Sequence, residues 1–182
     1  MRQVHGAHVV NAGELTAMPD ADAAIARKVG TVCAVLIADC MPILLCNRAA
    51  TVVAIAHAGW RGLSSGVIEN TVREIDAAPS ELLAYLGPAI GPAAFEVGSD
   101  VRDAFNTTDP VAVQAFQPCG RNKWLADLRQ LARMRLAASG VNHVFGVDLC
   151  TYSDATRFYS YRRDKVTGRM AALIWLDPDQ AS

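Results

Sequence analysis

Residues 31–62 read TVCAVLIADCMPILLCNRAATVVAIAHAGWRG, three apolar segments separated by short polar breaks. The apolar segments are 31–38, 43–46 and 51–56, and the first is rich in β-branched residues. Short apolar runs of this kind, with no alternation of polar residues, predict strands that are buried on both faces. The stretch therefore predicts a sheet at the centre of the molecule.

Helices and further strands follow along the chain. From Leu63 the apolar residues recur at helical spacing as far as Ile75, which predicts a helix. The remaining expected elements are strands at 82–86 and 143–149, a short helix from Ser99, a longer helix between Asp127 and Gly140, and paired strands at 157–161 and 170–176. Strands outnumber helices, and hairpins mix with longer crossovers, so the sequence predicts a mixed α+β fold.

Composition narrows the class of protein. A chain of 182 residues that is 52% hydrophobic and 19% charged predicts one globular domain over residues 1–182. The net charge of -1 gives no broad electrostatic case for nucleic acid or an acidic membrane as partner. Neither a signal peptide nor an apolar run of the ~20 residues needed to span a bilayer is visible. The five cysteines are odd in number and irregularly spaced, which favours a reducing cytoplasm over a disulfide framework.

Three residues stand out as candidate metal ligands. His5 follows Gln3-Val4, Cys40 lies at the end of the first buried strand, and His57 ends the third. If the strands of Cys40 and His57 are neighbours and run the same way, both side chains project from one edge of the sheet. Two imidazoles and one thiolate suit Zn²⁺, with Cu²⁺ as a softer alternative, and leave a fourth coordination position for water or substrate. Such an open position is typical of catalytic zinc.

The same residues admit other interpretations. Cys40 is equally interpretable as a small buried apolar residue, and His57 as a hydrogen-bonded core histidine. A metal-free hydrolase is a further alternative, in which Cys40 is the nucleophile, His57 its base and Asp39 the group that orients the histidine. The basic residues Arg162, Arg163, Lys165 and Arg169 form either an anion site or a solvated turn.

Five motifs together resemble a known family, the laccase-domain proteins, also called polyphenol oxidase-like or purine nucleoside phosphorylase-like. The motifs are Gln3-Val4-His5-Gly6, Ala38-Asp39-Cys40-Met41-Pro42, His57-Ala58-Gly59-Trp60-Arg61-Gly62, Gly87-Pro88-Ala89-Ile90-Gly91 and Phe158-Tyr159-Ser160-Tyr161-Arg162-Arg163-Asp164. The resemblance runs from residue 3 to about residue 176. It implies a four-layer α-β-β-α sandwich, similar to the catalytic domain of cytotoxic necrotizing factor toxins, and zinc bound by His5, Cys40 and His57.

The resemblance also implies an activity. Family members phosphorolyse adenosine, inosine and methylthioadenosine and deaminate adenosine, whereas the older family name implies copper-dependent oxidation of phenols. Several copper ions need more imidazole and thiolate ligands than four histidines provide, which favours the nucleoside activity. A hydrolase acting on cell-wall amide bonds is the metal-free alternative.

Other residues receive expected roles from their chemistry. Arg61 and Arg162 are candidate phosphate ligands, because a guanidinium binds phosphate in a bidentate fork. Asp39 is a candidate for the carboxylate that orients a ligand histidine. The family usually has several tens of residues before its Gln-Val-His-Gly motif, so we expect this chain to lack the family's N-terminal segment. The family also has a threonine where the string Asp22-Ala23-Ala24-Ile25-Ala26 has none.

Overall fold

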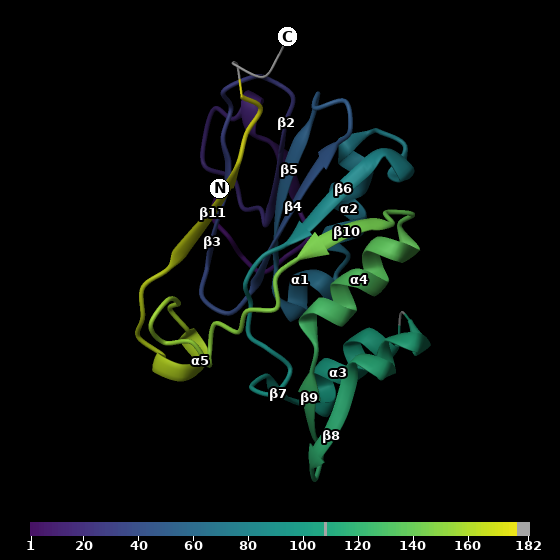
Figure 1. Ribbon diagram of the computed structural model, residues 1–182, viewed down its shortest axis with the longest axis vertical. Coiled ribbons are helices and arrows are strands. Elements are labelled where there is room, and N and C mark those ends of the chain that lie inside the picture. Colours follow the sequence, from purple (N-terminus) through teal and green to yellow (C-terminus); the bar gives the residue numbers. More distant parts are fainter. Residues whose placement is uncertain (108, 178–182) are drawn as a thin grey trace.

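A six-stranded sheet forms the centre of the molecule, with strand order β1-β2-β5-β4-β6-β10 (Figure 1). We describe residues 1–107 and 109–177 of a computed structural model. The strands of this sheet are β1 (Val9–Asn11), β2 (Ala23–Ala26), β4 (Met41–Asn47), β5 (Val53–Ala58), β6 (Leu82–Leu86) and β10 (His143–Gly146). The hairpin of β4 and β5, which the opening stretch predicts, lies in the middle of the sheet.

Two smaller sheets complete the β-structure. In the first, β3 (Cys33–Ile37) pairs antiparallel with β11 (Met170–Ile174). In the second, β9 (Lys123–Ala126) lies between β7 (Glu96–Gly98) and β8 (Phe116–Gly120). The helices are α1 (Trp60–Ser64), α2 (Val67–Ile75), α3 (Ser99–Asn106), α4 (Leu128–Ala138) and the short α5 (Tyr161–Asp164). Three 3₁₀ turns lie at Ala12–Glu14, Pro79–Glu81 and Pro110–Ala115.

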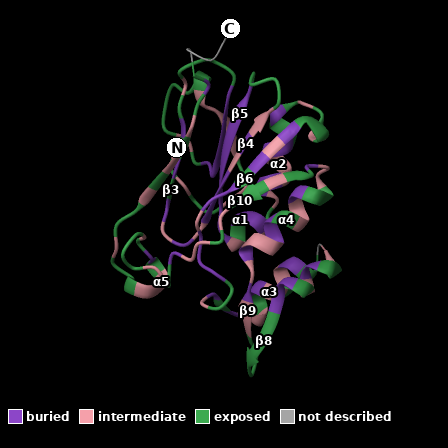
Figure 2. Ribbon diagram, viewed as in Figure 1, coloured by how far each residue is buried: buried purple, intermediate pink, exposed green. Residues whose placement is uncertain are grey.

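Strand β5 is buried along its whole length because both faces of the sheet are covered (Figure 2). Ala54 and Ala56 belong to the core cluster that also contains the buried side chains of α2 and α4. Val53 and Ile55 point to the opposite face and pack in a second cluster with the inward side chains of β3. Because successive side chains of β5 point to opposite faces, this strand packs against the helices on one side and against the β3–β11 sheet on the other.

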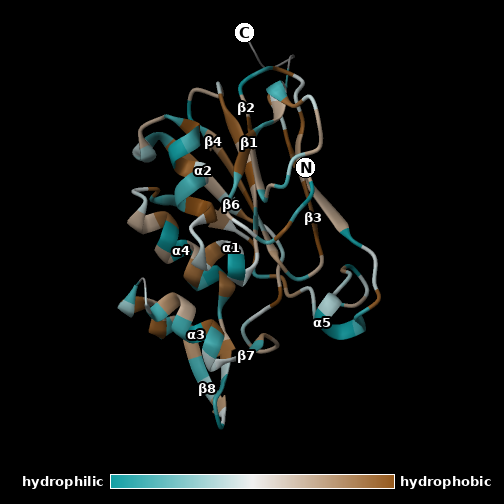
Figure 3. Cartoon of the chain, turned by 180° about the vertical axis from the view of Figure 1, so that it is seen from behind, coloured by the Kyte–Doolittle hydropathy of each residue, from teal (hydrophilic) through white to brown (hydrophobic). Residues whose placement is uncertain are grey.

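Helices α2 and α4 each bury an apolar stripe in the core cluster. Figure 3 shows hydrophobic and hydrophilic residues interleaved along the helices. Helix α2 buries Val67, Ile68, Thr71, Val72 and Ile75, which recur at helical spacing. At the start of α4, the Asp127 carboxylate accepts hydrogen bonds from the backbone N–H groups of Arg129 and Gln130. Such a cap is the reason that the helix begins where the sequence predicts.

The mixed α+β class is confirmed, and the described residues form three of the four expected layers. These layers are the helices, the six-stranded sheet and the β3–β11 sheet (Figure 1). The outward side chains of β3 and β11 are exposed, and Leu36 and Leu173 are 53% and 48% accessible. No helix in residues 1–107 and 109–177 meets the length and hydropathy required to cross a membrane.

Some local predictions were wrong. The helix predicted from Leu63 to Ile75 is two helices, because Gly66 adopts a left-handed φ of 88° between them. The strand predicted at 157–161 is absent: the Ser160 hydroxyl accepts a hydrogen bond from Arg163 N and thereby caps the short helix α5. The expected partner of that strand, β11, pairs with β3 instead.

Candidate metal centre

The hairpin of β4 and β5 brings two of the three candidate ligands to one end of the central sheet. In the antiparallel register, Met41 is opposite Ala58 and Pro42 is opposite His57. Cys40, which directly precedes Met41, therefore lies beside the end of β5. The predicted strand 31–38, which was expected to carry Cys40 beside the strand of His57, became β3 in a different sheet. Cys40 reaches the site at the start of β4, which runs antiparallel to β5, so the start of one strand meets the end of the other.

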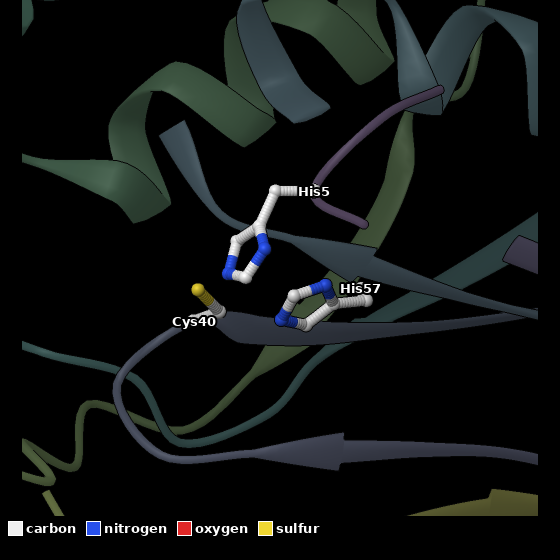
Figure 4. A group of neighbouring side chains, drawn as sticks. All are labelled: His5, Cys40 and His57. Atoms are coloured by element: carbon white, nitrogen blue, oxygen red, sulfur yellow. The ribbon is translucent and has the colours of Figure 1, made fainter. Parts of the chain in front are cut away.

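Side chains of His5, Cys40 and His57 gather into one cluster (Figure 4). The ligand atoms of the three residues all lie within 4.8 Å of one another. The two imidazole rings meet edge to face, with centroids 4.9 Å apart. Small side-chain adjustments bring such atoms to the bond lengths of about 2.0–2.3 Å that zinc makes with nitrogen and sulfur. The donor set therefore fits a single zinc or copper ion.

His57 is held by a carboxylate that the sequence analysis did not assign. Its Nδ1 lies 2.8 Å from Oδ1 of Asp22, and Asp22 is fully buried. Burial lowers the pKa of His57 and outweighs the hydrogen bond to Asp22, which raises it. The imidazole is therefore neutral at pH 7, which is the state that binds metal ions.

Asp39, the residue expected to orient a ligand histidine, makes other contacts. One oxygen of its carboxylate accepts a hydrogen bond from Thr151 Oγ1 and the other from the backbone N–H of Arg162, each at 2.7 Å. Asp39 thus fixes the segment that contains Arg162, and the position beside the histidine belongs to Asp22. The signal for Asp22 in the sequence is an acid directly before the apolar run 23–26, since an aspartate buried there needs partners.

The thiol of Cys40 is largely removed from solvent. Burial raises its pKa to about 12, the carboxylates of Asp39 and Asp22 act in the same direction, and Arg169 and Arg61 act against them. A cysteine that serves as a free nucleophile shows the opposite shift, toward the thiolate. A cation at the site would stabilise the thiolate directly. The raised pKa therefore counts against Cys40 as a free thiolate nucleophile.

Gly59 leaves the space that the Cys40 sulfur occupies. A Cβ atom added at Gly59 would lie 2.7 Å from Cys40 Sγ and 3.5 Å from His5 Cδ2. The backbone of Gly59 has an ordinary φ of -78°, so the close approach, and not backbone strain, requires glycine here.

We therefore expect Gly59→Ala to displace the thiol and to lower zinc affinity by roughly 10-fold or more, as loss of a group that orients a ligand does. The measurement is competition for zinc against a coloured chelator. Gly13→Ala is the control, because its added Cβ lies at an ordinary 3.5 Å from Asn11 Oδ1. Equal zinc affinities of Gly59→Ala and the natural protein would contradict the packing argument.

A cavity of about 690 Å³ opens beside the three ligands. Its wall includes the aromatic side chains of Trp60, Phe95 and Tyr161 and the cationic side chains of Arg61, Arg162 and Arg169. The guanidinium of Arg61 lies over the Trp60 ring at 4.6 Å, and that of Arg162 over the Phe95 ring at 5.3 Å. Apolar walls with a few convergent polar groups are typical of small-molecule sites.

Arg163 lies in the same segment but has a different role. Its guanidinium donates to the carbonyl oxygens of Thr151, Tyr152 and Phe158 and pairs with the carboxylate of Asp164. Arg163 thus holds the loop that presents Arg162. Among the four basic residues of segment 162–169, Arg162 and Arg169 line the cavity.

Fold and site together define a mixed α+β protein with a two-histidine, one-cysteine cluster beside a basic cavity. A family model described as multi-copper polyphenol oxidoreductase laccase matches residues 1–177. The chain therefore belongs to this laccase-like family, as the motifs indicated.

Relatives of known name and structure support this assignment. A protein of Escherichia coli strain K12 named purine nucleoside phosphorylase YfiH is 56% identical over 177 residues, which are 97% of this chain and 72% of the relative. The purine nucleoside phosphorylase PA4543 of Pseudomonas aeruginosa is 51% identical over 96% of this chain and 72% of the relative. The crystal structure of Neisseria meningitidis protein NMB0706 shares the fold, with a TM-score of 0.94 and 54% identity over 96% of this chain and 73% of that one.

Proposed function

We propose that the chain is a zinc-dependent purine nucleoside phosphorylase, with His5, Cys40 and His57 as the zinc ligands. The observation that carries the proposal is the position of the three-ligand cluster in the wall of a cavity that also contains arginines and aromatic rings. Two close relatives are named purine nucleoside phosphorylases. Adenosine, inosine and methylthioadenosine are the proposed substrates, and the cytoplasm is the proposed compartment.

Arg61 and Arg162 are the proposed phosphate ligands. Both line the cavity, and both guanidinium groups stack on an aromatic ring, which restricts their motion. Arg162 is held further: its Nη1 donates to the carbonyl of Glu96, and its backbone N–H donates to Asp39. Cations fixed in this way bind phosphate without first losing conformational entropy.

The proposed reaction uses these contacts. A phosphate oxygen attacks C1′ of the ribose, the bond from C1′ to the purine nitrogen breaks, and that nitrogen takes a proton, which gives ribose 1-phosphate and the free base. The arginines hold the phosphate, while Trp60, Phe95 and Tyr161 offer apolar surface to the purine. A bound zinc ion supplies Lewis acidity toward the substrate. Deamination, the second proposed activity, replaces the purine amino group by the oxygen of water and releases ammonia.

Zinc is proposed over copper because the described chain offers ligands for one ion. Within residues 1–107 and 109–177, His5, Cys40 and His57 are the one group of histidine, cysteine and acidic side chains that gathers this closely. One site of this kind matches single-zinc chemistry, whereas the oxidation of phenols by several copper ions needs several sites.

A product assay tests the proposal. Zinc-loaded protein with adenosine and phosphate is expected to yield adenine and ribose 1-phosphate, and without phosphate to yield inosine and ammonia slowly. Removal of zinc by a chelator should abolish both activities, and added zinc should restore them. Full turnover of adenosine by the metal-free protein would contradict the zinc dependence, and no turnover by the zinc-loaded protein would contradict the proposed function.

The same assay examines the phosphate ligands through Arg61→Gln. This variant should keep its zinc and raise KM for phosphate about 10-fold or more, because a charge-assisted contact contributes about 1.5–3 kcal/mol. Arg73→Gln is the matched control, since Arg73 lies on the exposed side of α2 and contacts Asn70.

A further inference from the structure

We propose that Asp22 is the positioning residue that assembles the metal site, because its one carboxylate holds both histidine ligands in place. The inference rests on the proposed metal site of His5, Cys40 and His57. Asp22 directly precedes β2 and is fully buried. A buried carboxylate persists only with several hydrogen-bond donors around it.

Both oxygens of Asp22 are used. Oδ1 accepts hydrogen bonds from the backbone N–H of His5 at 2.9 Å and from the ring of His57 at 2.8 Å. Oδ2 accepts from the backbone N–H groups of Gly6 at 2.7 Å and of Val4 at 3.1 Å. These four donors surround the carboxylate and offset the cost of burying it.

The contact with His57 selects the metal-binding form of the ring. A carboxylate accepts hydrogen bonds, so Nδ1 of His57 carries the proton, and Nε2 keeps its lone pair for a metal ion. The main chain holds the same two residues together, because the backbone N–H of His57 donates to the carbonyl of Asp22 at 2.7 Å. Asp22 thus fixes both the orientation of the His57 ring and the ring nitrogen that carries the proton.

The contacts with residues 4–6 hold the other histidine. Three successive N–H groups converge on the carboxylate, an arrangement that proteins use to bind anions. His5 has a positive φ of 60°, which is uncommon for a residue with a side chain. The hydrogen bonds to Asp22 offset the cost of this conformation, which is on the order of 1 kcal/mol. In this conformation the His5 ring reaches Cys40 and His57 (Figure 4).

Asp22→Asn tests the inference through zinc affinity. An asparagine offers one acceptor oxygen in place of two, and its amino group would face backbone N–H donors or His57 Nδ1. We expect zinc affinity to fall roughly 10- to 100-fold, as it does when an outer-shell partner is lost. Asp20→Asn is the control: Asp20 lies two residues away and pairs with Arg2 at the surface. Its zinc affinity should match that of the natural protein.

A second measurement needs no variant and no metal. Long-range proton–nitrogen NMR spectra of the metal-free natural protein should show His57 protonated at Nδ1 and unprotonated at Nε2. A folded Asp22→Asn protein with undiminished zinc affinity would overturn the inference, and so would a His57 ring protonated at Nε2 in the natural protein. Failure of the natural protein to bind zinc would contradict the proposed function, whereas the tautomer of His57 tests the role of Asp22 by itself.

Discussion

Replacing Cys40 with alanine is expected to abolish zinc binding and phosphorolysis together. The sulfur is one of three ligands, and its loss removes a metal bond and not merely a group that orients one. Zinc affinity should therefore fall by more than the roughly 100-fold that outer-shell changes cost. The metal-free protein should keep its fold, because the substitution removes only the sulfur atom beside Gly59 and changes stability by about 1 kcal/mol.

Two measurements together check this expectation: the zinc content of the purified variant and the rise in melting temperature that zinc causes. The natural protein should be stabilised by zinc, because the ion binds the folded chain through residues far apart in sequence, and the variant should not. Cys46→Ala is the control, since Cys46 is a thiol on β4 that packs against the second core cluster. A Cys40→Ala protein with full zinc content and normal phosphorolysis would contradict the ligand assignment.

Replacing Arg163 with methionine is expected to remove phosphorolysis and to leave zinc binding intact. Methionine keeps the apolar stem but loses every donor to the carbonyl oxygens of Thr151, Tyr152 and Phe158. The loop that presents Arg162 then loses its anchor. A displacement of about 1 Å at a substrate ligand can cost about 100-fold in rate, and we expect a fall of this order in kcat/KM.

The test is specific because it measures zinc affinity and kcat/KM on the same variant. Arg163→Met should bind zinc as the natural protein does, because Arg163 has no contact with the three metal ligands among those described, and its melting temperature should be lower. Arg157→Met is the control: Arg157 lies in the same segment, but it pairs with Asp154 at the surface. If Arg163→Met kept its kcat/KM, the loop would not depend on Arg163, and the proposed role of Arg162 would lose its support.

Parts of the fold with strong local signals were predicted well from the sequence. The apolar runs at 43–46 and 51–56 became β4 and β5 in the central sheet, as their lack of polar alternation indicated. The start of α4 was predicted from Asp127, because aspartate is a common residue at the N-cap of a helix. In these elements local sequence preference and tertiary burial agree.

Other parts depend on contacts that a local pattern does not contain. Strand β2 is a short run of small residues, and its burial comes from β5 beside it. Strand β8 contains Pro118 and Gly120 and is mostly exposed, so it has no apolar period. The partner of β11 is set by the second core cluster, in which Ile174 packs near β3. Each of these elements owes its place to a long-range contact.

In the candidate site, too, some residues were predicted from local signals and others depend on long-range contacts. His5, Cys40 and His57 were proposed from residue type and strand ends, and the structure brings them together. Asp39, proposed to orient a histidine, contacts Thr151 and the backbone of Arg162 instead. The carboxylate that reaches His57 is that of Asp22, 35 residues before His57 in a segment where no strand was predicted. Which acid meets which histidine is a property of the sheet order, since β2 pairs with β5.

X-ray absorption at the zinc edge tests the central claim most directly. In zinc-loaded protein the account predicts one sulfur ligand at about 2.3 Å and two imidazole nitrogens at about 2.0–2.1 Å, with the shell completed by a lighter atom. Loss of the sulfur signal in Cys40→Ala would locate that ligand. A zinc shell of oxygen and nitrogen alone in the natural protein would contradict the account.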